Sequence, residues 1–182
     1  IDLSDIDGSL TDTSKSAYYE YDPGARTLTI YQDTPKSDDA PLSYRIWQSG
    51  SSLVDEIVVN GITTDITIDG IDVTGDIVLE NGADVSLYLR KDSVIDGSVS
   101  APSGRTLTID SSDLYGIGVG NTLTVTAADA DSAGIGGGAS QAAGTITING
   151  GNVIAIGNGE GAGIGGGGNG NGGTITINGG NV

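Results

Sequence analysis

Residues 144–153 read GTITINGGNV, and residues 173–182 repeat the same ten residues 29 positions later. A second motif, AGIGGG, occupies residues 133–138 and returns at 162–167 with the same spacing. A period between about 20 and 50 residues is typical of proteins in which each repeat forms one structural turn and buries its apolar face against its neighbours. The sequence therefore predicts a solenoid.

The TITI segment of the repeat has the pattern of a β-strand. Apolar and polar residues alternate with a period of two, and all are β-branched, which is typical of a strand with one buried face. The Asn-Gly-Gly-Asn that follows suits positive φ angles and predicts a tight bend. We interpret the Gly-rich motifs as further bends, each with one isoleucine pointing inward: Ile117, Ile135 and Ile164. No stretch of this region has a helical period, so short strands joined by bends are expected.

Similar strands precede the repeat at looser spacing. Together with the repeated strands, they start at Ile66, Leu87, Leu107, Leu123, Ile146 and Ile175. Intervals of roughly 20 to 30 residues suit one coil of a parallel β-helix. We therefore predict an all-β fold in which residues 53–182 form a right-handed parallel β-helix with an interior of Ile, Leu and Val. The short step from Leu107 to Leu123 predicts a change of cross-section. Because Val182 stops inside a repeat, we expect the natural protein to continue with further coils.

Residues 1–52 differ from the repeats and are predicted to form a β-rich N-terminal cap. Residues 16–21 and 26–31 read as the two strands of a β-hairpin, joined at Asp22-Pro23-Gly24-Ala25 by a type II turn. The apolar run 42–47 is expected to pair nearby. A cap is needed because an open end of a β-helix exposes unpaired backbone and apolar interior.

The composition excludes several classes of site. The chain has 7 basic and 24 acidic residues, for a net charge of -17, and contains neither Cys nor His. Disulfides, thiolate metal sites, imidazole-ligated zinc and a Ser-His-Asp triad are therefore excluded. Binding of nucleic acid is not expected, because it needs clustered Lys and Arg. Insertion into a membrane is not expected either, because no apolar run is long enough.

The sequence also resembles a known family. Residues 80–99 (ENGADVSLYLRKDSVIDGSV), the TLTI strand, and the cycle of GTITINGGNV and GAGIGGG resemble large surface proteins of Gram-positive bacteria. Such repeats are often described as carbohydrate-binding or adhesin-like regions on a pectin-lyase-like right-handed β-helix. The resemblance covers about residues 53–182 and offers no catalytic motif. It implies a secreted, non-enzymatic module of the bacterial cell surface, which serves as a rigid adhesin stalk or binds a polysaccharide, a host glycan or a host protein, without a required cofactor.

Stacking the strands creates one candidate site. The residue after each inward pair forms an outward column that begins with Asp69, Arg90 and Asp110, with neighbours about 4.8 Å apart. The simplest interpretation is a solvated ladder of ion pairs, worth about 0–1 kcal/mol per exposed pair. The alternative is a calcium-dependent polysaccharide lyase, in which acids hold the metal and Arg90 or Lys91 abstracts a proton next to a uronate carboxylate.

Aromatic side chains offer a second candidate site, because their flat faces stack on the apolar side of a sugar ring. The residues considered for ligand binding are Tyr19, Tyr21, Tyr31, Tyr44, Trp47 and Tyr88. The competing interpretation is that Trp47 and at least half of the tyrosines form the small core of the cap. A glycan site would then lie on the cap and beside Tyr88.

Outward threonines offer a third interpretation. The same alignment predicts a column of Thr67, Tyr88, Thr108, Thr124, Thr147 and Thr176, with a second Thr two residues earlier on each of the last four strands. Paired threonines on a flat face resemble the arrays of ice-binding solenoids. Thr is also simply a common outward residue in strands.

Calcium is the one metal that the acidic composition suggests. Acidic pairs such as Asp38 with Asp39 and Asp129 with Asp131 suit weak calcium binding in an extracellular protein. A simpler explanation is that the acids keep a strand-rich repeat protein in solution. No motif identifies a metal ligand.

Overall fold

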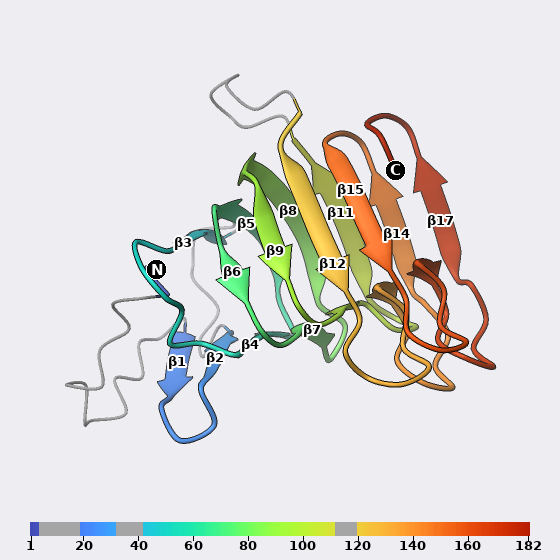
Figure 1. Ribbon diagram of the computed structural model, residues 1–182, viewed down its shortest axis with the longest axis horizontal. Coiled ribbons are helices and arrows are strands. Elements are labelled where there is room, and N and C mark those ends of the chain that lie inside the picture. The colour runs from blue at the N-terminus through green and yellow to red at the C-terminus, as the bar shows by residue number, and fades with distance from the viewer. Residues whose placement is uncertain (4–18, 32–41, 112–119) are drawn as a thin grey trace.

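The computed structural model describes residues 1–3, 19–31, 42–111 and 120–182. These residues form β-strands and turns, with no helix among them and hence none that could cross a membrane. The strands stack in coils along one axis, from the N-terminal end to the C-terminal end (Figure 1). The all-β class predicted from the sequence is confirmed.

Three sheets form the walls of the coil, and we name them by their place in Figure 1. The back sheet consists of β3 (Leu42–Trp47), β5 (Thr63–Asp69), β8 (Asp84–Lys91), β11 (Thr106–Asp110), β14 (Thr145–Ile148) and β17 (Thr174–Ile177). The front sheet consists of β6 (Asp72–Val73), β9 (Ser93–Ile95), β12 (Thr122–Thr126) and β15 (Asn152–Ile156). The base sheet consists of β1 (Tyr19–Asp22), β2 (Thr27–Ile30), β4 (Glu56–Asn60), β7 (Ile77–Glu80), β10 (Val99–Ser100), β13 (Ile135–Gly136) and β16 (Ile164–Gly165).

Each coil visits the base, back and front sheets in turn. Strands β7, β8 and β9 make one such coil, and each pairs in parallel with the strand one coil earlier and one coil later. In Figure 1 the chain rises along the back sheet and descends along the front sheet as it advances from N to C, which is a right-handed winding. The predicted right-handed parallel β-helix is confirmed, with the handedness usual for parallel crossovers.

The interior consists of columns of apolar side chains that cross from coil to coil. In the back sheet the register aligns Ile66, Leu87, Ile109 and Ile148, and each is at most 2% exposed. The intervening residues of the same strands face outward and, except for Asp69, are partly or fully exposed. Because each buried side chain packs against the coils on either side of it, the columns couple neighbouring coils into one folded unit.

The register differs from the sequence-based alignment at two places. Leu87 pairs with Ile109 rather than with Leu107, so β11 is displaced by two residues. Leu123 lies on β12 in the front sheet and pairs with Ser93. The short interval between Leu107 and Leu123 therefore separates two strands of one coil, and it does not indicate a change of cross-section. Alternation of apolar and polar residues is unchanged by a shift of two, so it could not fix the register of β11. Nor does alternation distinguish a strand of the back sheet from a strand of the front sheet.

Glycines allow neighbouring coils to approach closely. Ile135 and Gly136 form the short strand β13, which pairs with Ile164 and Gly165 of β16, so these motifs contain strands of the base sheet rather than bends alone. A Cβ on Gly136 would collide with the carbonyl oxygen of Gly165. Ile135 is fully buried, as predicted, while Ile117 lies outside the described residues.

The N-terminal strands continue the sheets. β1 and β2 form the predicted antiparallel hairpin, and β2 and β3 pair in parallel with β4 and β5 of the first full coil. The predicted type II turn was wrong, because the left-handed residue of the loop is Arg26 (φ 55°) and not Gly24. Asp22 Oδ1 instead accepts hydrogen bonds from the amides of Gly24 (2.8 Å) and Ala25 (3.1 Å), and so stabilises a four-residue loop.

Candidate functional site

The strongest candidate site lies on the outer face of the back sheet, where β3, β5 and β8 lie side by side. Strand register places Trp47 next to Asp69, and Asp69 next to Lys91. In the adjacent column it places Arg45 beside Thr67, which in turn lies beside Tyr88. Because alternate residues of a strand share a face, both columns project from the same side of the sheet.

Asp69 is the centre of this arrangement. Its Oδ2 accepts a hydrogen bond from Arg45 Nε (2.8 Å) and from Arg90 Nη1 (3.1 Å), and it also contacts Arg45 Nη2. Lys91 Nζ lies 3.0 Å from Oδ1. The Asp69 side chain is 0% exposed, and the three cations contact it from the neighbouring strands. We call Asp69, Arg45, Arg90 and Lys91 the cationic cluster.

A β-bulge brings two of these cations to one carboxylate. The register of β5 and β8 shifts between Ile68 and Asp69, so that Ile68 pairs with Leu89 while Asp69 pairs with Lys91. Arg90 is thus the extra residue of the bulge, and its side chain still reaches Asp69. Bulges often redirect side chains in this way, and they are frequent near functional sites.

The cations also set the protonation of Asp69. Burial alone would raise its pKa, but hydrogen bonds and charge from Arg45 and Lys91 outweigh burial and hold the pKa below its ordinary value. The carboxylate is therefore ionised and neutralises one of its three partners. The cluster keeps an excess of positive charge on a chain whose net charge is -17.

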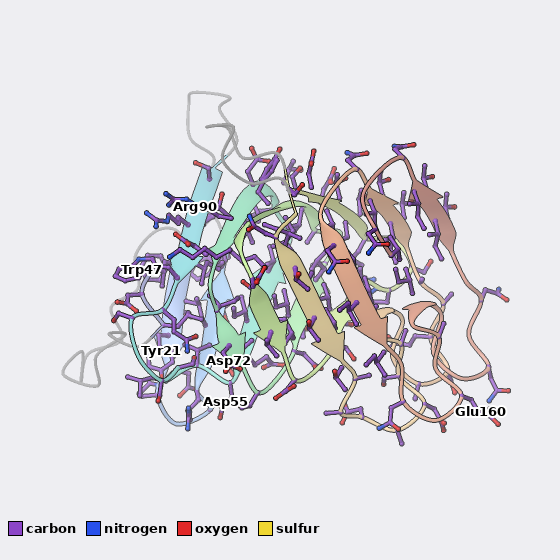
Figure 2. The ribbon with its side chains drawn as sticks, turned by 45° about the horizontal axis from the view of Figure 1, so that its top comes forward. Tyr21, Trp47, Asp55, Asp72, Arg90 and Glu160 are labelled. Carbon is purple, nitrogen blue, oxygen red and sulfur yellow. The ribbon has the colours of Figure 1, made fainter. Side chains whose placement is uncertain are left out.

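Positive charge and aromatic surface occur together here. Trp47 is 37% exposed and lies on the same strand as Arg45, two residues along, at the same end of the coils as Arg90 (Figure 2). The interpretation of Trp47 as part of the cap core was therefore wrong. Tyr88 is partly exposed on the same face, one strand away from Thr67. The face therefore combines cationic donors with aromatic rings.

The remaining candidates from the sequence lie elsewhere. Asp110 pairs with Tyr88 rather than following Arg90, so the predicted ladder of Asp69, Arg90 and Asp110 is limited to its first pair. Tyr19, Tyr21 and Tyr44 pack against the hydrophobic core, in agreement with a core role. Tyr31 directly follows β2 and is partly exposed.

Two residues of the cluster were not among the ligand-binding candidates. Arg45 was missed because residues 42–47 were assigned to a cap without a defined partner strand. The alternation of Ser43, Arg45 and Trp47 with apolar neighbours contained the signal, since it assigns these three residues to one outward face. Lys91 was considered only as the base of a lyase, because the bulge that brings it to Asp69 cannot be read from the alternation.

The acidic side chains give no equivalent metal centre. Among the described residues, no three acidic side chains gather closely enough to hold an ion. Asp131 Oδ1 accepts a hydrogen bond from the amide of Glu160 (3.0 Å), and Asp38 and Asp39 lie outside the described part of the chain. Calcium binding stays a prediction without a named ligand set.

Comparison with protein-family models found no match, and comparisons with curated proteins and with solved structures found none either. The architecture is that of a β-solenoid, with parallel sheets and no helix among the residues described. Any narrower family assignment remains the resemblance drawn from the sequence.

Proposed function

We propose that this protein is a non-enzymatic module of a secreted bacterial surface protein, and that it binds acidic polysaccharide through the cationic cluster and Trp47. The observation that carries the proposal is the convergence of Arg45, Arg90 and Lys91 on Asp69 beside an exposed tryptophan. The resemblance of the repeats to bacterial surface proteins is the basis for the location.

The cluster has hydrogen-bonding capacity left for a ligand. The side chains of Arg45 and Lys91 are 53% and 68% exposed, although both contact Asp69. A guanidinium carries five N–H donors and an ammonium three, so one carboxylate leaves several donors unused. A uronate carboxylate or a sugar sulfate can accept these in a charge-assisted, bidentate contact. Trp47 supplies a flat apolar face for the sugar ring.

The fold holds these groups ready for binding. The cations sit on strands, not on long loops, and each is anchored by the same buried carboxylate. A site whose side chains are already ordered loses less conformational entropy when a ligand binds. The stacked coils also give the module stiffness, as an adhesin stalk requires.

Overall charge narrows the class of glycan. A chain with a net charge of -17 repels a densely charged polyanion at long range. The cluster attracts an anionic group only within about a Debye length, roughly 8–10 Å at physiological salt. The site therefore favours glycans whose acidic residues are separated by neutral ones.

The test is calorimetric titration with an oligosaccharide of alternating uronate and neutral sugars, and with its carboxyl-reduced, neutral counterpart. We expect binding of the uronate form and about tenfold weaker binding by Arg45→Gln or Lys91→Gln, the effect of losing one charge-assisted hydrogen bond. Arg105→Gln is the matched control. It removes the same charge at a residue that contacts Ser103 outside the cluster.

Two results would contradict the proposal. Equal affinity for the reduced oligosaccharide would show that the carboxylates are not recognised. Equal weakening by Arg105→Gln would show a general charge effect instead of a site.

Paired threonines support a second candidate function, the binding of ice. Register aligns Thr106, Thr145 and Thr174 in one outward column and Thr108, Thr147 and Thr176 in the next. Three successive coils therefore present paired threonines, not the four expected, because Thr122 and Thr124 lie on the front sheet. This function predicts thermal hysteresis that Thr147→Tyr abolishes, and absence of hysteresis in the native protein would remove it.

No comparable observation favours the lyase alternative. Both oxygens of Asp69 already contact cations, and Arg90 donates a hydrogen bond to that carboxylate. Release of unsaturated uronate products would be the direct assay for that activity.

A further inference from the structure

A separate polar cleft lies near the N-terminal end of the coils, between residues 48–55, which follow β3, and residues 72–74 at strand β6 of the front sheet. Its volume is about 420 Å³, and its principal lining residues are Arg26, Gln48, Ser51, Asp55, Asp72 and Thr74. This volume is within the range of about 300–1,000 Å³ that is common for small-molecule sites. Asp55 and Asp72 lie close together in Figure 2, on the side of the molecule that also carries Tyr21.

One wall of the cleft is fixed by hydrogen bonds. Arg26 donates from Nε to the carbonyl of Leu53 (3.0 Å) and from Nη2 to the carbonyl of Ser52 (3.0 Å), and Nη2 also lies 3.0 Å from Asp55 Oδ1. Thr74 Oγ1 donates to the same oxygen of Asp55 (3.1 Å). Tyr21 adds a hydrogen bond to the carbonyl of Leu53 (2.8 Å). The loop and both side chains are therefore held in place before any ligand arrives.

The other wall presents groups that are free to bind. The amide of Asp72 donates to Gln48 Oε1 (2.8 Å), which orients the Gln48 side chain and leaves its Nε2 donor available. The Asp72 carboxylate has no hydrogen-bond partner among the residues that the structure describes, and the side chain is exposed. Gln48 directly follows β3 and Asp72 begins β6, so a donor and an acceptor line the same cleft.

We infer that this cleft is a binding site for a neutral sugar, recognised through neighbouring hydroxyl groups. One hydroxyl donates to the carboxylate of Asp72 while the next accepts from Gln48 Nε2, and Ser51 adds a hydroxyl that can do either. An anionic ligand is disfavoured by the carboxylates of Asp55 and Asp72. A cation is disfavoured at Asp55, because Arg26 already neutralises that side chain. This site is distinct from the cationic cluster and does not depend on the function proposed for it.

The test is NMR titration of the full ¹⁵N-labelled chain with the methyl glycosides of glucose, galactose, mannose and N-acetylglucosamine. We expect shifts of the backbone amides at Gln48, Asp72 and Thr74 with at least one of them. Asp72→Asn should weaken that binding about tenfold, because a charge-assisted hydrogen bond from the sugar hydroxyl becomes a neutral one. Gln48→Glu should weaken it at least as much, because it removes the Nε2 donor. Both substitutions keep the shape of the side chain. Asp96→Asn is the matched control, an exposed acid outside this cleft.

Each outcome of the titration either supports or overturns the neutral-sugar site. Shifts in the cleft that both variants weaken and Asp96→Asn preserves support the inference. Absence of shifts with all four glycosides, shifts confined to other residues, or equal binding by Asp72→Asn overturns it. Binding that requires added calcium overturns it in favour of a metal site. Arg45→Gln should leave this binding unchanged, so failure of one site can be told from failure of the other.

Discussion

Lys91 Nζ lies 3.0 Å from Oδ1 of Asp69, a carboxylate that has no solvent-exposed surface. The two residues belong to successive coils, β8 and β5, which the same ion pair joins on the outside of the back sheet. Arg45 of β3 reaches Asp69 from the other side. One buried carboxylate therefore links three strands, and its removal should affect both the stability of this end and the positions of its cations.

Asp69→Asn should destabilise the protein at neutral pH by about 1.5–3 kcal/mol, the range for hydrogen bonds to charged groups. The folded state lowers the pKa of Asp69 below its ordinary value of 3.8, so its contribution is present above that value. The contribution is lost as the pH falls through the lower, folded pKa. Thermal unfolding from pH 7 to pH 2 should therefore show wild type and variant converging in acid. Asp65→Asn, which changes a partly exposed acid of the same strand, is the control and should alter the stability at neutral pH by less than about 0.5 kcal/mol.

Asp76→Asn should stabilise the protein at neutral pH, whereas Asp69→Asn should destabilise it. Burial raises the pKa of Asp76, although a hydrogen bond from the Ser98 amide (2.6 Å) favours the charged form. When folding raises the pKa of an acid, the folded protein loses stability as the pH rises from the ordinary pKa through the raised one. The reason is that the folded protein must then hold a charge that is partly removed from water. Asn keeps an oxygen acceptor for Ser98 and removes the charge. The unfolding midpoint should rise at pH 7, and the gain should disappear in acid; a lower midpoint at pH 7 would contradict this account.

The identical repeats explain why the C-terminal coils could be predicted from the sequence. Ile146 pairs with Ile175 and Thr147 with Thr176, as their equal positions in the two copies require. No such identity links Leu87 to Leu107 or to Ile109, and either pairing keeps the apolar residues inside. The alignment chose the wrong one. Where the repeats diverge, the register depends on the lengths of the loops between strands. The alternation of apolar and polar residues within a strand carries no information about those lengths.

The candidate site was less predictable for the same reason. The contact between Asp69 and Arg90 followed from stacking β5 on β8. The participation of Lys91 required the bulge after Ile68, which is a property of the paired strands and not of either sequence alone. Arg45 required the knowledge that β3 extends the back sheet. Composition could indicate only that cations are few, and not that three of them meet.

Gly136→Ala should be strongly destabilising, by about 2–4 kcal/mol or more. Its φ angle of 136° is rarely adopted by residues with a side chain, and the added Cβ would meet the carbonyl oxygen of Gly165 on the next coil. Gly172→Ala is the matched control, since a Cβ there has open space and its φ angle is not left-handed. The measurement is the free energy of unfolding in urea. Equal losses at the two positions would mean that the coils do not approach as closely as the β13 and β16 pairing requires.

Ile109→Ala tests the interior columns against the surface. Ile109 is 0% exposed and pairs with Leu87 and Ile148, so truncation leaves a cavity bounded by two other coils. Such a cavity costs about 2–5 kcal/mol in a packed core. Ile154 faces outward on β15 and is 44% exposed, so Ile154→Ala removes the same atoms from a position that still reaches water and should cost under about 1 kcal/mol. If the two variants lost similar stability in urea unfolding, Ile109 would not be an inward residue. The register of β8 with β11, and with it the separation of Arg90 from Asp110, would then have to be redrawn.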